Sequence, residues 1–369
     1  MAHGAVTAVS GAQVRADTAP IGGAFELHPS ALVQLDDAES RLPGLSVTSG
    51  RTALAVLAQR TPGLWLLPAY LCETALQPLR SEGVRFDFYA VGADLQPRLD
   101  ELERAVERES PAAVLVVDYF GFPPLEADRL RALRETCVVV EDCVHGSLLE
   151  LPDHAGGRVG DVAFTAFRKY VAVPDGGVLL GVDGEPLPPA DGEHVRSRLL
   201  GQLLRGAAIA GDVPYAEAEP IFLSLLESGE TALDALPPAA TSTLSQRLLA
   251  RHDLGAAARR RRGNFRALLE ALPDGVTPLF SELPPGVSPL LLPVRVAAGA
   301  RDALRSALIR RRVYCPVHWP LPEEIDEQRF PAEHRLSREI LGLPIDQRYD
   351  GADMERLARE LAEAWRELP

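Results

Sequence analysis

The sequence alternates between short, β-branched apolar runs and longer stretches whose apolar residues recur at helical spacing. In the first 143 residues the apolar runs predict strands at 64–70, 84–91, 112–120 and 137–143. The helical stretches between them lie at 50–60, 73–82, 98–108 and 125–134. Continuous apolar runs are typical of strands that are covered on both faces. The alternation therefore predicts an α/β fold with a mostly parallel central sheet flanked by helices.

The remaining pattern predicts a second, smaller α/β unit. The elements expected there and just before it are strands at 162–167, 177–181, 289–296 and 313–317, and helices at 195–235, 244–271 and 350–366. Pro237-Pro238 marks a boundary, and Asp350 is a plausible N-cap of the last helix. The predicted parts are a mobile N-terminal tail at 1–20, a large domain at 21–236 and a small C-terminal domain at 237–369.

The overall charge argues against nucleic acid as a partner. The formal net charge is −14, whereas nucleic-acid binding usually needs a basic face. The one basic run, 259–262, lies in a helical stretch, and we interpret it as a solvated face or a subunit contact. No apolar stretch is long enough to span a bilayer, and the first residues lack the apolar core of a signal peptide.

The cysteines favour a reducing compartment. Cys72, Cys137, Cys143 and Cys315 form no CxxC pair, so we expect free thiols in a cytoplasmic protein.

Two residues at predicted strand ends carry the chemistry. Asp142 ends the apolar run 137–143, and Lys169, the only lysine in the chain, follows the run 162–167 and precedes a Pro-Asp-Gly-Gly turn. Ligands bind beyond the carboxyl ends of parallel strands, where Asp142 and Lys169 are both expected. A lysine that forms a Schiff base and an aspartate that holds a pyridinium proton are what pyridoxal phosphate (PLP) requires. Burial and the adjacent Arg168 would lower the pKa of the lysine.

His145 lies three residues after Asp142 and is placed to donate to the phenolic oxygen of the cofactor. A helix cap is the simpler role for Asp142, and a metal site from Asp142, His145 and His154 is the competing interpretation of this region. The latter lacks a tight ligand pattern, so we expect no metal.

The stretch Ser49-Gly50-Arg51-Thr52 suits a phosphate, because it combines a glycine with the start of a helix and two hydroxyl side chains. Ser49 is a plausible N-cap of this helix, and because any capped helix looks similar, the pattern is weak when taken alone. Thr165, near Lys169, is a further hydroxyl that is predicted to face the phosphate.

Aromatic residues after two strands are candidates for the walls of the site. Tyr70 and Cys72 follow the strand at 64–70, and either could lie on the cofactor ring, with Tyr70 the better stacking group. His318 and Trp319 follow the strand at 313–317 and suggest a wall on the substrate side. Core packing explains each of these residues about equally well.

Taken together, these residues resemble the DegT/StrS-type PLP-dependent aminotransferases, which are of fold type I in the aspartate aminotransferase superfamily and act on keto sugars of nucleotide sugars. The resemblance covers about residues 40–365. It rests on Ser49-Gly50, Ala53-Leu54, Glu141-Asp142, Gly160-Asp161, Phe164-Thr165, Lys169, Gly176-Gly177 and the Leu-Pro element at 339–345.

The resemblance implies that Lys169 forms the internal aldimine, that Asp142 pairs with the pyridinium nitrogen, and that the backbone of 50–52 with Thr165 holds the phosphate. It also implies a homodimer with its active sites at the subunit interface. The chain departs from the family at His145, where glutamine is usual, and at Arg51, where threonine is usual. An Asn-Tyr-Arg segment that reaches the neighbouring subunit is replaced by Ala-Ala-Thr-Ser-Thr at 239–243.

We therefore expect an aminotransferase that moves an amino group from a small donor to a sugar-like or other biosynthetic keto acceptor. Arg51 and Arg168 are candidates to hold a donor carboxylate. The alternative is PLP chemistry of another type on an amino acid, such as decarboxylation, elimination or oxygen-dependent chemistry. A third possibility is a non-enzymatic partner or sensor with the same fold.

Overall fold

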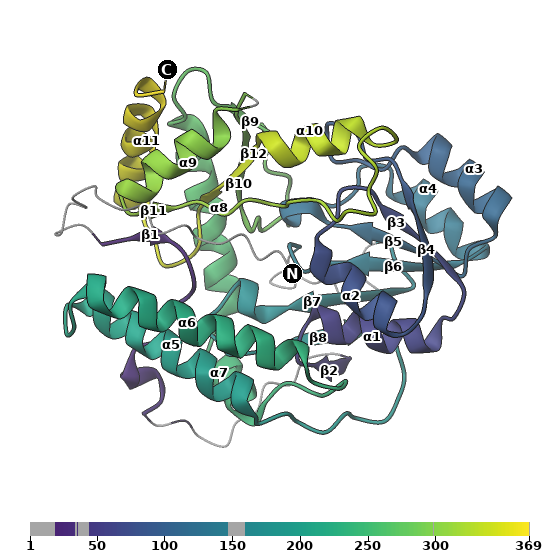
Figure 1. The fold of residues 1–369 in the computed structure, drawn as a ribbon, viewed down its shortest axis with the longest axis horizontal. Coiled ribbons are helices and arrows are strands. Elements are labelled where there is room, and N and C mark those ends of the chain that lie inside the picture. Colours follow the sequence, from purple (N-terminus) through teal and green to yellow (C-terminus); the bar gives the residue numbers. More distant parts are fainter. Residues whose placement is uncertain (1–18, 34, 36–43, 147–158, 298, 369) are drawn as a thin grey trace.

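The computed structural model describes residues 19–33, 35, 44–146, 159–297 and 299–368 (Figure 1). The predicted tail therefore lies almost entirely outside the described residues. The largest element is a seven-stranded sheet of order β2-β8-β7-β6-β5-β3-β4. Its strands are β2 (Leu45–Val47), β3 (Leu64–Pro68), β4 (Arg85–Tyr89), β5 (Ala113–Val117), β6 (Val138–Asp142), β7 (Val162–Ala166) and β8 (Gly177–Leu180). The strands β3 to β7 run parallel, and β8 pairs antiparallel with both β7 and β2. The mostly parallel sheet expected from the sequence is confirmed.

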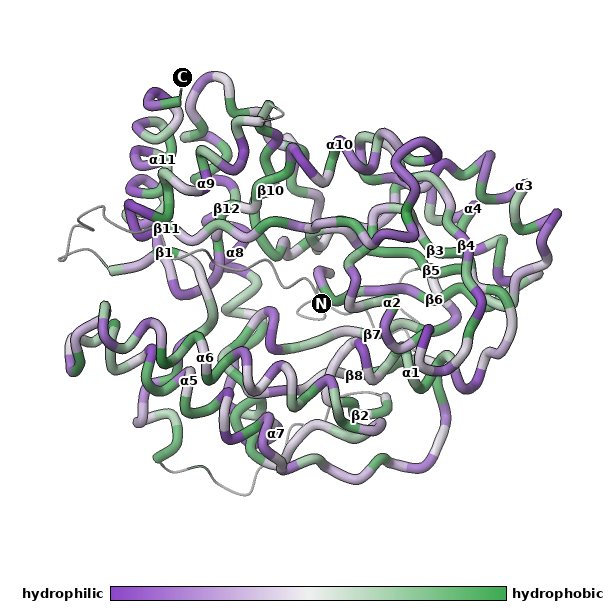
Figure 2. The backbone as a smooth tube through the Cα atoms, viewed as in Figure 1, coloured by the Kyte–Doolittle hydropathy of each residue, from purple (hydrophilic) through white to green (hydrophobic). Residues whose placement is uncertain are grey.

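Helices cover the sheet on both faces. Its crossover connections contain α1 (Gly50–Arg60), α2 (Glu73–Ser81), α3 (Leu99–Glu109) and α4 (Ala127–Ala132), with short 3-10 turns at Tyr119–Gly121 and Leu133–Glu135. Right-handed crossovers put α1 and α2 on one side of the sheet and α3 and α4 on the other, as Figure 1 shows. The core strand β5 is buried along its whole length, which explains its unbroken apolar sequence. In Figure 2 the central strands are mostly green, whereas the outer helix α3 shows much purple.

A helical hairpin follows the sheet. It consists of α5 (Glu193–Ala210) and α6 (Tyr215–Asp234), which lie side by side in Figure 1. The prediction of one helix at 244–271 is wrong, because this stretch forms two helices, α7 (Thr243–Ala250) and α8 (Leu254–Glu270). The break occurs at Asp253, whose side chain accepts the backbone N–H of Ala256 and so begins a new helix.

The C-terminal region contains a three-stranded sheet of order β12-β10-β9. Its elements are β9 (Thr277–Pro278), β10 (Leu291–Arg295), α9 (Arg301–Arg310), β11 (Val313–Tyr314), α10 (Pro331–Glu339), β12 (Ile340–Pro344) and α11 (Gly351–Arg366). β11 pairs in parallel with β1 (Ile21–Gly22), and a 3-10 turn at Pro29–Ala31 follows β1. The predicted cap of α11 is confirmed, since Asp350 accepts the N–H groups of Ala352 and Asp353. The domain boundaries stay a prediction.

The basic run at 259–262 has two environments. Arg259 and Arg260 are exposed, which agrees with a solvated face. Arg261, by contrast, is 1% exposed and donates to Gln347 and to the carbonyl of Leu290. The interpretation of the whole run as a solvated face or a subunit contact is therefore wrong for Arg261. The described helices include none that is long and apolar enough to cross a membrane.

A buried carboxylate anchors the turn after Lys169. Asp175 is fully buried and accepts from the hydroxyl of Ser242 at 2.6 Å and from its backbone N–H at 3.1 Å. Its second oxygen also lies 3.1 Å from Nε2 of His194 on α5. Asp175 thus ties the turn to the start of α7 and to α5. The hydrogen bond from Gly176 N to Thr48 O continues this connection to the residue that precedes Ser49.

Two aspartates, Asp175 and Asp191, bond to residues at the start of α7, and we expect them to contribute differently to the free energy of unfolding. Asp175→Asn turns an amide N–H₂ toward the donors of Ser242, so we expect a loss of about 1–3 kcal/mol in the free energy of unfolding. Asp191→Asn is the matched control, because Asp191 accepts from Thr243 at the same helix end but is partly solvated, and should cost about 0.5 kcal/mol or less. Urea titrations followed by circular dichroism measure both, and equal losses would contradict this assignment.

Candidate active site

The two residues of the predicted pair lie at the same edge of the sheet. Asp142 is the last residue of β6, and Lys169 ends a 3-10 turn (Phe167–Lys169) that directly follows β7. β6 and β7 are parallel neighbours, with Asp142 opposite Phe164 in the register. Their carboxyl ends therefore bring the carboxylate and the amine to one side of the molecule.

Burial controls the electrostatics of this pair. Burial raises the pKa of Asp142 to about 7, against the stabilising effects of the Val144 N–H bond and of the Lys169 charge. Burial also lowers the pKa of Lys169, and the adjacent Arg168 lowers it further. Within the described residues, Lys169 makes no ion pair with any carboxylate, so its amine is available for chemistry. The hydrogen bond from Val144 N at 2.8 Å fixes one oxygen of Asp142.

The N-terminus of α1 lies against this edge. A Cβ added to Gly50 would lie 3.0 Å from Val144 Cγ2 and 3.3 Å from the ring of Phe164, so the glycine lets the helix start come close to β6 and β7. Ser49 is the N-cap and accepts from Thr52 N at 3.2 Å, as predicted. The hydroxyl of Thr52 is 2.6 Å from that of Thr48. In the described chain the backbone N–H groups of Gly50 and Arg51 have no hydrogen-bond partner, which is what an anion at a helix N-terminus requires.

Thr165 lies near the site but uses its hydroxyl elsewhere. It is buried on β7, and its Oγ1 donates to the carbonyl of Cys143 at 3.1 Å. A contact with phosphate would require this proton to be redirected. Its role in phosphate binding stays a prediction.

An aromatic layer lines the site. The ring of His145 stacks on Trp319 with centroids 5.2 Å apart and on Phe120 at 5.8 Å, and it meets His318 edge-on at 5.0 Å. Burial lowers the pKa of His318 to about 3 and holds that of His145 well below its usual value, and the charge of Lys169 adds to both effects. Both imidazoles are therefore neutral at pH 7. The Nδ1 atom of each is buried and has no partner among the described residues.

Tyr70 and Cys72 have different positions. Tyr70 is fully buried and donates its hydroxyl to the carbonyl of His318. Its ring centroid lies 5.5 Å from that of Trp319, so it packs against the aromatic layer and helps to hold it in place. Cys72, the N-cap position of α2, shares electrostatic interactions with both Asp142 and Lys169. Burial raises the pKa of its thiol. Of the two, Cys72 is the one that the structure brings close to the acid–amine pair.

Arg51 and Arg168 are held by carboxylates of α6. Arg51 pairs with Glu230 at 2.7 Å and with Asp234 at 2.8 Å, and Arg168 binds Glu230 through both terminal nitrogens. Arg198 of α5 contributes a third contact to Glu230 at 3.0 Å. Burial alone would raise the pKa of Glu230, but the arginines reverse this and hold it far below its usual value.

Sequence reasoning missed the α5–α6 residues of this cluster and a second support of Lys169. The carbonyl of Tyr170 accepts from Gln347, and Arg261 lies over the Tyr170 ring at 4.7 Å. The contacts with Glu230 and with Tyr170 join residues that lie 32 to 179 positions apart, and no local pattern in the sequence marks them. The charged residues of α6, which interrupt an otherwise small and apolar stretch, were the one available signal for Glu230 and Asp234.

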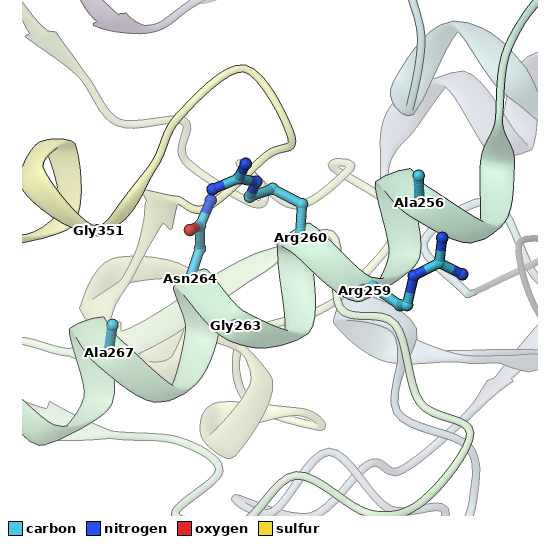
Figure 3. Close-up of a pocket in the computed structure, with 7 residues that line it drawn as sticks. All are labelled: Ala256, Arg259, Arg260, Gly263, Asn264, Ala267 and Gly351. Carbon is cyan, nitrogen blue, oxygen red and sulfur yellow. The ribbon is translucent and has the colours of Figure 1, made fainter.

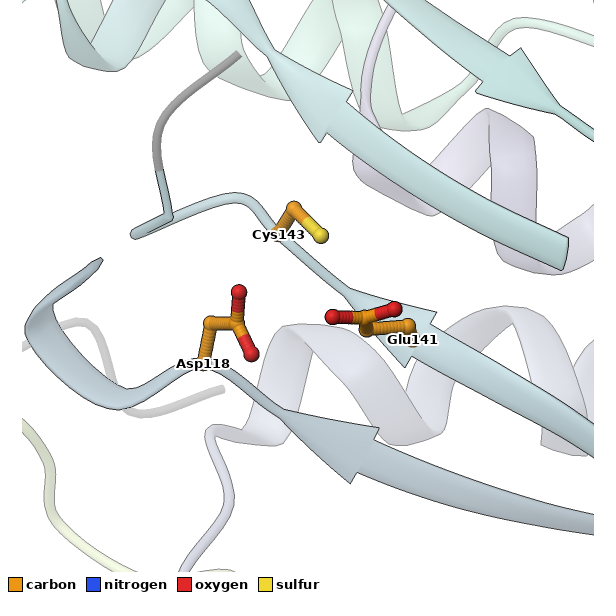
Figure 4. A group of neighbouring side chains, drawn as sticks. All are labelled: Asp118, Glu141 and Cys143. Carbon is orange, nitrogen blue, oxygen red and sulfur yellow. The ribbon is translucent and has the colours of Figure 1, made fainter. Parts of the chain in front are cut away.

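Two other features lie outside this arrangement. Asp118, Glu141 and Cys143 gather with their ligand atoms within 4.8 Å of one another (Figure 4). Glu141 uses this position to accept the N–H groups of Val159 and Gly160, which is a structural role. A hollow of about 440 Å³ is lined by Ala256, Arg259, Arg260, Gly263, Asn264, Ala267 and Gly351, which include none of the predicted site residues (Figure 3). The competing metal site included His154, which is outside the described residues.

Comparisons with known proteins agree with this geometry. Residues 76–187 match the model of the DegT/DnrJ/EryC1/StrS aminotransferase family. The resemblance seen in the sequence is thereby confirmed over this segment, and the solved structures below confirm the expected fold.

Solved structures of DegT-type proteins share the fold. The aminotransferase TlmJ from Streptoalloteichus hindustanus is 21% identical over 88% of this chain and 86% of its own, with a TM-score of 0.63. PseC from Helicobacter pylori, an aminotransferase involved in the biosynthesis of pseudoaminic acid, is 12% identical over 95% of this chain and 100% of its own (TM-score 0.65). The PLP form of Spr1654 from Streptococcus pneumoniae is 12% identical over 95% and 98% of the two chains (TM-score 0.66). No curated protein matches the sequence.

The raised pKa of Asp142 gives a prediction for the cofactor-free protein. The folded state holds this proton more tightly than the unfolded state, so the Asp142 contribution to stability falls as the pH rises from about 4 through 7. In Asp142→Asn this loss is absent. The stability of the variant relative to wild type should therefore increase over that range by up to about 4 kcal/mol, for a shift of roughly three pKa units.

Denaturant titrations of both proteins at several pH values measure this difference. Asp128→Asn is the control, because the side chain of Asp128 is 98% exposed, and its curve should run parallel to that of wild type. If the difference in stability between Asp142→Asn and wild type does not change with pH, the pKa of Asp142 is not raised in the folded protein.

Proposed function

We propose that this protein is a PLP-dependent aminotransferase in which Lys169 holds the cofactor and Asp142 pairs with its ring nitrogen. The observation that carries the proposal is the placement of a half-buried acid and a half-buried, unpaired amine at the ends of two adjacent parallel strands. When bound, PLP supplies a ring that withdraws electrons from the carbon attached to the substrate nitrogen. The residues of this chain fit that group.

Each residue near the pair has a distinct task in this proposal. The lowered pKa of Lys169 favours the neutral, nucleophilic form of its amine, and the same Nζ would serve as the acid–base group that moves a proton at the substrate Cα. Burial raises the pKa of Asp142 to about 7, and a cationic ring nitrogen beside this carboxylate would favour its ionised form. The α1 N-terminus receives the phosphate through the N–H groups of Gly50 and Arg51.

The neutral imidazoles set the character of the remaining wall. His145 faces the cofactor side, where it can donate to the phenolic oxygen, and His318 with Trp319 forms the substrate side. Uncharged donors and acceptors beside an aromatic surface suit a hydroxylated, sugar-like keto acceptor better than a second carboxylate. PseC acts in the biosynthesis of pseudoaminic acid, which agrees with an acceptor of this class.

The assembly and the location belong to the same proposal. We expect a cytoplasmic homodimer that uses a small amino donor. The four cysteines are free in the structure, as a reducing compartment requires.

The sole lysine makes the central assignment easy to test. Addition of PLP to the wild-type protein should produce a visible absorbance band, and borohydride reduction should then fix one pyridoxyl phosphate group per chain at Lys169, as located by peptide mass spectrometry. Lys169→Arg keeps the positive charge but removes the primary amine, so we expect neither the band nor the label, and a loss of activity of at least about 10⁴-fold.

Arg259→Lys is the matched control for this experiment, because it adds a primary amine at an exposed position outside the site. The label in this variant should still be found at Lys169. Labelling of Lys169→Arg to the wild-type extent, at the chain terminus or elsewhere, would rule out the proposed role.

A further inference from the structure

A compact ion cluster lies beside Lys169 and joins four separate elements. Glu230 of α6 accepts from Arg51 at the start of α1, from Arg168 in the 3-10 turn and from Arg198 of α5. The side chains of the three arginines are only 13–14% exposed, and that of Glu230 is 22% exposed. Surface ion pairs contribute little, but a largely buried cluster of this size has to be fully compensated to be stable.

The cluster has an excess of positive charge and hydrogen-bond donors without acceptors. Three guanidinium groups face two carboxylates in direct contact, Glu230 and Asp234, which leaves one positive charge. Asp175 acts on Arg168 and Arg198 only at longer range, because its oxygens are bonded to Ser242 and His194. The Nε atoms of Arg168 and Arg198 are buried and have no partner in the described chain. Arg51 uses only its Nη2 atom in its two ion pairs.

This surplus lies where the cofactor phosphate has to be. Arg51 is the second residue of α1, so its backbone N–H belongs to the helix N-terminus and its side chain to the cluster. Arg168 precedes Lys169 directly, and both arginines act electrostatically on the Lys169 amine. A phosphate dianion at the helix start is therefore within reach of both guanidinium groups.

We propose that Arg51 and Arg168, held together by Glu230, supply the cationic side of the phosphate subsite from within the same chain. The proposal rests on the proposed function, but it changes the role of the two arginines from donor-carboxylate binding to phosphate binding. Arg198, Glu230 and Asp234 are positioning residues that hold the arginines and set the charge of the subsite. Glu230 in particular competes with the phosphate for the same guanidinium groups.

The segment at 239–243 agrees with this assignment. Thr241 donates its hydroxyl to Val47 O, and Ser242 is bonded to Asp175, so this segment is committed to contacts within its own chain. A phosphate with about two negative charges needs a positive counterpart. The cluster provides one on the α5–α6 side of the site.

The test compares PLP with pyridoxal, which has the same aldehyde and ring but no phosphate. Cofactor-free, full-length wild type is titrated with each compound, and Kd is read from the absorbance change. Arg51→Gln and Arg168→Gln should each weaken PLP binding by about tenfold or more and change pyridoxal binding less than about twofold. Calorimetric titration with inorganic phosphate should show the same loss without any covalent step.

Glu230→Gln gives a result of opposite sign. Removal of the competing carboxylate should tighten the binding of PLP and inorganic phosphate several-fold, although it lowers the thermal stability of the cofactor-free protein. Glu230→Asp keeps the charge and should lie close to wild type in affinity. Glu103→Gln is the control, because Glu103 binds Arg129 in an exposed cluster and should leave both affinities unchanged.

Several outcomes would overturn the proposal. Equal weakening of PLP and pyridoxal in the arginine variants would show that the arginines act on folding or on the ring. Weaker phosphate binding in a folded Glu230→Gln protein would show a purely structural cluster, and if this variant does not fold, the PLP-to-pyridoxal ratios of the arginine variants decide alone. If wild type gives no covalent band with either aldehyde, the proposed function fails, whereas the titration with inorganic phosphate still decides this inference.

Discussion

The constraint on which the site depends is the cost of placing a carboxylate and an amine in a region with little water and no ion pair between them. Asp142 and Lys169 respond as that cost requires, because burial moves the pKa of each toward the neutral form. A direct ion pair would have lowered the cost but would also have occupied both groups. The fold keeps them apart at the ends of two adjacent strands, and it thereby preserves a nucleophile and an acceptor for a ligand that fits between them.

Such an arrangement needs rigid surroundings, and the structure provides them from distant parts of the chain. The Pro-Asp-Gly-Gly turn is anchored through Asp175 to α5 and α7. The carbonyl of Tyr170, directly after Lys169, is held by Gln347 beyond β12. Arg261 links the same region to Leu290, so the C-terminal unit determines the position of the lysine as much as the large sheet does. Asp175 and Arg261 therefore stabilise the structure around Lys169 through buried hydrogen bonds, a role that their sequence context does not indicate.

The fold and the central pair could be predicted from the sequence because both rest on local patterns. Apolar runs located β3 to β8, β10 and β11 to within a few residues, but not β1, β2, β9 and β12. Ser49 and Asp350 marked helix starts through side-chain caps that the structure contains. The division of 244–271 into α7 and α8 was missed because the capping residue Asp253 lies inside a pattern that is helical on both sides. Arg261 was missed for another reason. Its burial depends on carbonyl groups that only the folded chain brings together, and a run of four arginines gives no local sign that one of them points inward.

The same distinction separates the arginines of the proposed phosphate subsite from those on the surface. Arg129 also gathers three carboxylates, Asp100, Glu103 and Glu126, but it does so from α4 in the exposed layer, where water screens the charges. The Glu230 cluster has the opposite composition, with three arginines around two carboxylates, and lies largely out of water. An excess of buried positive charge is unfavourable on its own, and an anion at the α1 N-terminus would compensate it. A fold that maintains this excess beside its only lysine is therefore more stable with a phosphate bound than without one, which couples cofactor binding to the integrity of the α5–α6 hairpin.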